Sequence, residues 1–104
     1  EGVGLAIKSK LQEIGNVKEA FIFGSYASGE ADQRSDLDVM IIGQVDLVQL
    51  APVISALKKD LNRPINYVIY SEEEWSQKAR GQDAFWLNVS RSPKIVLIGG
   101  ENAI

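Results

Sequence analysis

The fold is decided by residues 21–42, which read FIFGSYASGEADQRSDLDVMII. The apolar residues that end at Phe23 belong to a strand predicted over 17–23, because aromatic and β-branched residues favour strands. Small and polar residues then fill 24–35 and predict a loop with room for one short helical turn. Residues 37–42 are again apolar except for Asp38, and they predict a second strand.

The rest of the chain alternates helices and strands around this stretch. Apolar residues recur at helical spacing over 3–14 and over 46–61, so each segment predicts a helix with one buried face. Residues 65–70 predict a third strand, and capping signals predict two short helices between residues 71 and 93. A last apolar run at 95–98 predicts a fourth strand.

This order of elements predicts the fold class. The strand–helix–strand unit over 37–70 calls for two parallel strands with a right-handed crossover. The tight loop before residue 37 suits strands of opposite direction, so the first two strands should be antiparallel. We therefore expect an α/β (α+β) fold, a small mixed β-sheet with packed helices. Its size fits a single domain over 1–104, and the start at Glu1 suggests a domain excised from a longer chain.

Composition excludes several classes of chemistry. The chain has no cysteine and no histidine, so disulfides, zinc–thiolate sites and histidine-based catalysis are ruled out. A metal would need oxygen ligands, which favours Mg²⁺, Mn²⁺ or Ca²⁺. With 11 basic and 14 acidic residues the net charge is −3, so we expect no direct nucleic-acid binding by this domain. No signal peptide or membrane-length apolar run is visible, which predicts a cytoplasmic protein without a membrane partner.

Two short patterns could carry chemistry. Asp36 and Asp38 point to one face of a strand because strand side chains alternate, and such paired carboxylates suit a divalent cation. Gly24 and Ser25 follow a strand at a turn whose free N–H groups could bind phosphate. Taken singly, the first pattern is also explained by exposed acids and the second by a tight turn with a serine N-cap. An antiparallel strand pair would bring the two patterns together, as a Mg²⁺–nucleoside triphosphate requires.

Both patterns resemble the signature of a known superfamily. Phe23-Gly24-Ser25-x-Ala-x-Gly29 followed by Ser35-Asp36-x-Asp38-Val39 is similar to the DNA polymerase beta-type nucleotidyltransferases, and in particular to their minimal domains. The resemblance implies that Gly24 and Ser25 hold a triphosphate and that Asp36 and Asp38 bind Mg²⁺ or Mn²⁺. More weakly, the segments 64–74 and 93–99 resemble a subgroup attached to a winged-helix DNA-binding domain.

The third acid of the family is missing from its expected position. In the family a third carboxylate lies on the following strand and activates the attacking hydroxyl. Alternation along the third strand places Asn66 at that position. An amide oxygen can ligate a metal, but it carries no charge and accepts no proton. Asn66 therefore leaves two functions open.

The first function is transfer of a nucleoside monophosphate from a triphosphate to a hydroxyl acceptor, a protein being one candidate. The alternative is a catalytically degenerate module that senses nucleotide or regulates a partner. Arg34 could reach a phosphate or be an exposed loop charge. Three acids at 72–74 could replace the missing carboxylate, although helix capping explains them better. Finally, a base could stack on the aromatic residues Trp75, Phe85 and Trp86. Packing of these three side chains in the core is the simpler interpretation.

Overall fold

The computed structural model describes residues 2–30, 32 and 35–100. Within these residues the chain forms a four-stranded sheet of order β3-β2-β1-β4. The strands are β1 (Val17–Phe23), β2 (Leu37–Gly43), β3 (Ile65–Tyr70) and β4 (Ile95–Ile98). The helices are α1 (Gly2–Ile14), α2 (Gly24–Ser28), α3 (Leu47–Leu61), α4 (Glu72–Arg80) and α5 (Ala84–Arg91). The predicted mixed sheet with packed helices is confirmed.

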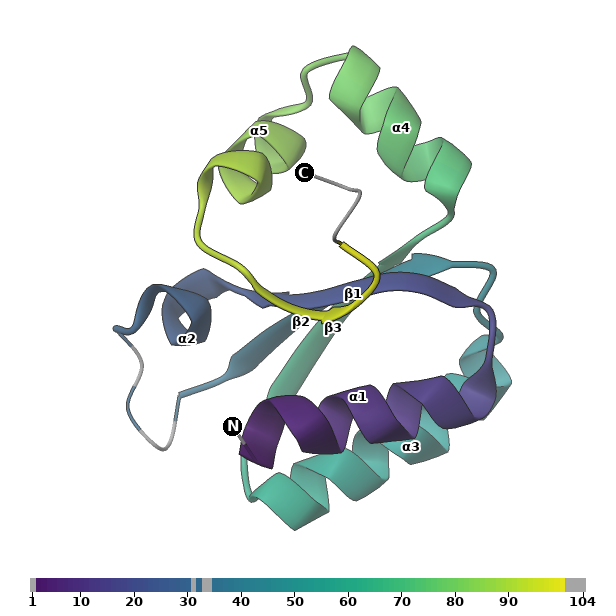
Figure 1. Cartoon of the computed structure of the whole chain (residues 1–104), viewed down its shortest axis with the longest axis vertical. Coiled ribbons are helices and arrows are strands. Elements are labelled where there is room, and N and C mark those ends of the chain that lie inside the picture. The colour runs from purple at the N-terminus through teal and green to yellow at the C-terminus, as the bar shows by residue number, and fades with distance from the viewer. Residues whose placement is uncertain (1, 31, 33–34, 101–104) are drawn as a thin grey trace.

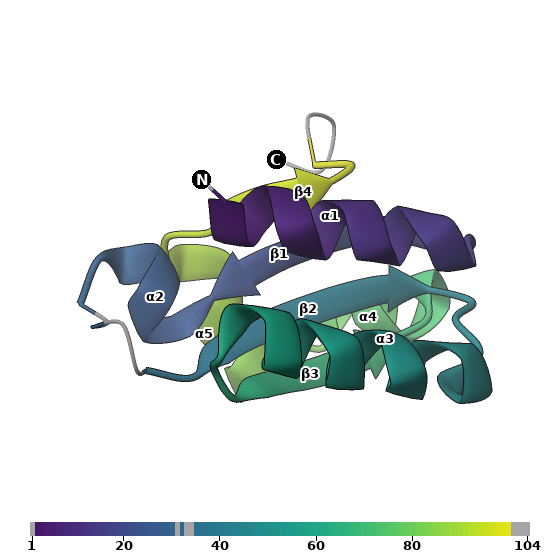
Figure 2. The ribbon, with the colours of Figure 1, turned by 90° about the horizontal axis from the view of Figure 1, so that it is seen from below.

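Helices cover both faces of the sheet. Figure 1 shows α1 and α3 on one face and α4 and α5 on the other, and Figure 2 shows α1 and α3 running side by side. The face toward α1 and α3 carries the larger apolar core, which includes Ile22, Val39 and Leu57. The opposite face carries a smaller core around Phe21 and Met40. The second face matters for function, because alternation along β2 puts the aspartates on the Met40 side.

The strand directions agree with those expected from the sequence. β1 runs antiparallel to β2, with Phe23 opposite Asp38. β2 runs parallel to β3, with Asp38 opposite Asn66. The end of β1 and the starts of β2 and β3 therefore meet at one edge of the sheet, which is where α2 begins (Figure 2).

Side-chain caps fix where the later helices begin. The Asp46 carboxylate accepts a hydrogen bond from the Val48 N–H at 2.9 Å and starts α3. Ser71 and Glu74 form the predicted capping box of α4. Asp83 accepts from the Trp86 N–H at 3.1 Å and starts α5. None of the helices in the described part of the chain has both the length and the apolar character needed to cross a membrane.

Candidate functional site

The two aspartates and Asn66 converge at the sheet edge. The side-chain nitrogen of Asn66 donates to Asp36 Oδ2 at 3.0 Å and to Asp38 Oδ1 at 3.2 Å. One amide group therefore bridges the carboxylates of Asp36 and Asp38, the residues directly before and after Leu37 in the chain. The parallel register of β2 and β3 makes this possible, because it sets Asp38 directly beside Asn66.

Gly24 lies against one of these carboxylates, that of Asp38. Its φ of +73° is a left-handed conformation that favours glycine. A Cβ added to Gly24 would collide with Asp38 Oδ2 and come within 3.3 Å of Asp38 Cγ. The backbone of the β1–α2 turn thus approaches Asp38 more closely than any residue with a side chain could. Glycine suits this position for two reasons: its backbone angle, and the absence of a Cβ that would push the Asp38 carboxylate out of its present orientation.

Ser25 lies inside α2 rather than before it. The N-cap of α2 is Phe23, which makes no side-chain cap, so the alternative of a serine N-cap is wrong. The Ser25 backbone oxygen accepts from Glu30 N at 2.9 Å and from Ser28 Oγ at 3.0 Å, which closes this short helix. The Ser25 side chain is exposed at the sheet edge that Gly24 also borders.

Asp36 precedes β2 and depends on its loop for its position. Ser35 and Asp32 form a local turn, in which Ser35 Oγ donates to Asp32 Oδ1 at 3.2 Å. On the other side of Asp36, the Leu37 N–H donates to the Pro64 carbonyl at 3.0 Å, which ties the start of β2 to the start of β3. Arg34, predicted to reach a phosphate, lies outside the described residues.

The donor set at this edge fits one hard cation. Two carboxylate oxygens already converge on a single Asn66 nitrogen, and oxygen ligands of this kind suit Mg²⁺ or Mn²⁺. A half-turn of the amide would replace Nδ2 by Oδ1 and supply a third, uncharged oxygen. Among the described residues no group of three or more acidic side chains is arranged to hold a metal ion. The edge therefore offers two negative charges where the family pattern has three.

The acids of residues 72–74 lie elsewhere. α4 begins just after Tyr70, which pairs with Ile42, whereas the site is at the opposite end of these strands, where Asp38 pairs with Asn66. Glu74 completes the capping box of α4. The hypothesis that one of these acids replaces the missing carboxylate is therefore wrong, and the capping interpretation is confirmed for Glu74.

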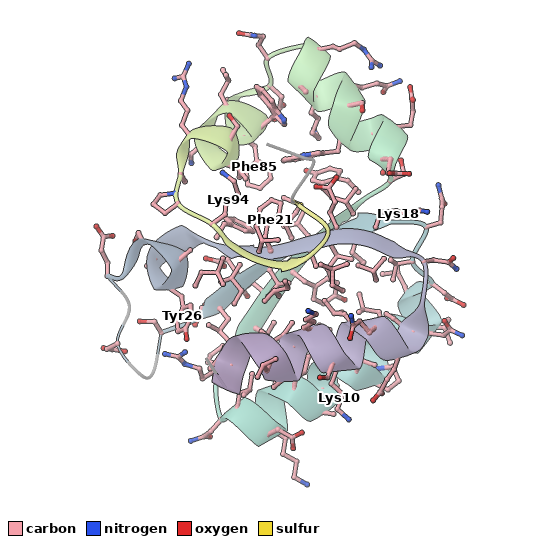
Figure 3. The ribbon with its side chains drawn as sticks, viewed as in Figure 1. Lys10, Lys18, Phe21, Tyr26, Phe85 and Lys94 are labelled. Carbon is pink, nitrogen blue, oxygen red and sulfur yellow. The ribbon has the colours of Figure 1, made fainter. Side chains whose placement is uncertain are left out.

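The aromatic residues belong mainly to the second core. Trp75 and Phe85 pack with their ring centroids 6.2 Å apart, edge to face. Figure 3 shows Phe85 and Phe21 on the α5 side of the sheet. Trp86 instead lines a cavity of about 350 Å³, together with Trp75 and Glu19. Core packing is thus confirmed for Trp75 and Phe85. The residues that line the cavity do not include Asp36, Asp38 or Asn66.

Glu19, which lines this cavity, is a titratable group with a shifted pKa. Burial raises the pKa of its carboxyl above the ordinary value, and the nearby carboxylate of Glu72 raises it further. Since β1 places Glu19 opposite Ile42 and Phe23 opposite Asp38, Glu19 lies toward the other end of the strand from the aspartates. It is therefore a feature of the α4–α5 side and not of the candidate site.

Comparisons with known proteins agree with this geometry. The family model described as "Nucleotidyltransferase domain" matches residues 6–87. A protein of Methanocaldococcus jannaschii, named "Putative protein adenylyltransferase", is 36% identical over 73 residues, which cover 70% of this chain and 71% of the relative.

Solved structures extend the comparison to the fold. A structure described as "putative minimal nucleotidyltransferase" is 29% identical, covers 86% of this chain and 85% of its own, and has a TM-score of 0.56. A toxin–antitoxin structure with AMP-PNP has a TM-score of 0.63 at 17% identity and covers 94% of this chain and 74% of its own, which shows a shared fold. The family match and the relative together establish that this chain belongs to the nucleotidyltransferase domain family, which confirms the resemblance to minimal nucleotidyltransferases.

Proposed function

We propose that this domain binds a nucleoside triphosphate with Mg²⁺ or Mn²⁺ and transfers the nucleoside monophosphate to a hydroxyl group. The observation that carries the proposal is the convergence of Asp36 and Asp38 on one Asn66 amide, beside a Gly24 that leaves no room for a side chain. The family match supports this assignment of the edge. ATP is the favoured nucleotide, because the M. jannaschii relative is named an adenylyltransferase.

Each residue at the edge has a distinct role in the proposal. Asp36 and Asp38 hold the cation through their facing oxygens. Gly24 lets the backbone of the turn approach the phosphates, and Ser25 adds a hydroxyl donor there. When bound, the cation would neutralise charge on the phosphates that leave. Arg34 remains a candidate phosphate ligand from the sequence alone.

The transfer step makes one bond and breaks one bond. The acceptor oxygen bonds to the α-phosphorus, and the bond from that phosphorus to the pyrophosphate oxygen breaks. The hydroxyl proton is lost to water, because the Asn66 amide cannot accept it. General-base catalysis typically contributes 10²–10⁴-fold, so we expect slow transfer by the natural chain.

A protein is the proposed acceptor. The M. jannaschii relative is named a protein adenylyltransferase, and the structure with AMP-PNP is a toxin–antitoxin complex. A partner protein that presents a side-chain hydroxyl would fit both. A DNA-binding domain attached to this one stays a prediction from the sequence, as do the single-domain organisation and the cytoplasmic location.

A specific observation favours a second function. Asn66 donates to both carboxylates at the position of the missing acid, and its amide cannot accept the proton of an attacking hydroxyl. Such a domain could bind nucleotide and signal to a partner without transferring anything.

The test uses triphosphates labelled at the α-phosphate, with Mg²⁺ or Mn²⁺ and with candidate acceptors that include the full-length protein. The experiment compares the labelling produced by the natural chain, by Asn66→Asp, and by Asp38→Asn as the inactive control. The transferase proposal predicts slow labelling by the natural chain, faster labelling by Asn66→Asp and none by Asp38→Asn. No labelling by either of the first two forms would contradict transfer and favour the nucleotide-sensing module.

A further inference from the structure

A buried cation, Arg63, lies two residues before the start of β3. Arg63 is only 9% exposed, although arginine is seldom fully buried without partners. Its backbone is fixed because the Arg63 N–H donates to the Lys58 carbonyl at 3.3 Å at the end of α3. The preceding residue, Asn62, caps α3 in a left-handed conformation with φ of +52°. The chain therefore turns the arginine side chain inward at a defined point.

The Arg63 guanidinium joins two segments that are far from it in the sequence. Its central carbon lies 5.0 Å from the centroid of the Tyr26 ring, which is a cation–π distance. One of its terminal nitrogens donates to the backbone carbonyl of Asp32. Figure 3 shows Tyr26 below α2, on the side of the sheet that faces α1. The Arg63 side chain thus contacts both α2, through Tyr26, and the loop that joins α2 to β2, through Asp32.

The residues of these two contacts lie close in the chain to three residues of the candidate site, Ser25, Asp36 and Asn66. Tyr26 follows Ser25 directly in α2, and Asn66 is the third residue after Arg63. Asp32 is hydrogen-bonded to Ser35, the residue directly before Asp36. Asp36 lies outside β2, so the sheet hydrogen bonds that hold Asp38 do not hold Asp36 directly. The Asn66 amide and the hydrogen bond from Leu37 to Pro64 hold Asp36 on the side of the sheet, and Arg63 anchors it from the side of the loop.

We propose that Arg63 is a positioning residue that holds Asp36 opposite Asp38 and Asn66, so that the edge is preorganised for a cation and a triphosphate. A hydrogen bond from a charged donor to a carbonyl is stronger than a neutral one. The rigid planar guanidinium of Arg63 also lies over the Tyr26 ring, a contact that a lysine ammonium does not reproduce. The functional part of this inference rests on the proposed function, whereas the structural part does not.

The structural part is tested by hydrogen exchange. The Ser35 N–H donates to the Asp32 carbonyl at 3.3 Å, so its exchange reports on the loop that Arg63 anchors. In Arg63→Met we expect Ser35 to exchange at least tenfold faster relative to Met40 and Ile41 in β2. Arg80→Met is the matched control, because Arg80 is exposed and contacts Glu73 at 3.6 Å on the outside of α4. Uniform acceleration of all amides, or none, would overturn the positioning role.

The functional part is tested by calorimetric titration of Mg²⁺–ATP. We expect at least tenfold weaker binding by Arg63→Met, partial recovery in Arg63→Lys, which can still donate to Asp32, and natural affinity in Arg80→Met. Equal affinity of Arg63→Met and Arg80→Met would overturn the link to the site. If the natural chain binds no Mg²⁺–ATP, the proposed function fails, and the exchange experiment still decides whether Arg63 anchors the loop. If Arg63→Met does not fold, Tyr26→Leu replaces it, with the same expectation for Ser35.

Discussion

Replacement of Gly24 by alanine separates the space at the site from the strain of its backbone. Both Gly24 and Gly29 have positive φ, of +73° and +83°. A Cβ at Gly24 would collide with Asp38 Oδ2, whereas a Cβ at Gly29 would meet nothing within 4 Å. Gly29→Ala is therefore a control with the same strain and no collision.

The two variants should lose similar stability. A left-handed conformation costs a residue with a side chain about 1–2 kcal/mol. For a domain near this size, that cost lowers the Tm by roughly 5–15 °C. The collision at Gly24 adds little to this cost, because the Asp38 carboxylate is the end of a partly exposed side chain and can rotate away.

The two variants should differ in ligand binding. Rotation of Asp38 would break its hydrogen bond from Asn66 and remove one of the two charges that face the proposed cation. We therefore expect Gly24→Ala to bind Mg²⁺–ATP at least tenfold more weakly than Gly29→Ala, which is a difference of about 1.4 kcal/mol. Calorimetry at a temperature where both variants are folded measures this. Equal affinity of the two alanine variants would refute the reasoning.

Two further predictions concern charge. Asn66→Asp places a third carboxylate beside Asp36 and Asp38, so its Tm should fall below that of the natural chain in EDTA and rise more steeply with added Mg²⁺; a Tm that ignores Mg²⁺ in both proteins would contradict the cation site. Glu19 has a raised pKa in the folded state, so the folded protein holds this proton more tightly than the unfolded chain, and Glu19 contributes less stability as the pH rises above about 4. Glu19→Gln should therefore gain Tm over the natural chain near about pH 7 and lose that advantage near about pH 3, with the exposed Glu13→Gln as control; a gain that does not change with pH would contradict the burial argument.

The order of elements and the sheet edge could be predicted from the sequence because local patterns determine them. Period-two alternation placed Asp36, Asp38 and Asn66 on one face, and the βαβ unit implied the parallel direction of β2 and β3, in which Asp38 pairs with Asn66. Gly24 was identified as a turn residue from its place after a strand. Its close approach to Asp38 could not be predicted, because it depends on how two strands pack at atomic distance.

Other features depended on tertiary contacts that no local pattern contains. Arg63 reads in the sequence as an ordinary charge before a strand, and only the folded chain brings it to Tyr26 and Asp32. Ser25 looked like a helix cap because serine favours that position, yet α2 begins at Gly24, two residues earlier than such a cap would allow. The bridging amide of Asn66 likewise requires three side chains from two strands and a loop.

The most direct test of the account is calorimetric titration of ATP with and without Mg²⁺, into the natural chain, Asp38→Asn and Asp60→Asn. Asp60 lies exposed near the end of α3 and controls for loss of one negative charge elsewhere. We predict that the natural chain and Asp60→Asn bind ATP only with Mg²⁺, and that Asp38→Asn binds at least tenfold more weakly. Equal affinity in all three proteins, or binding that does not depend on Mg²⁺, would contradict the proposed site.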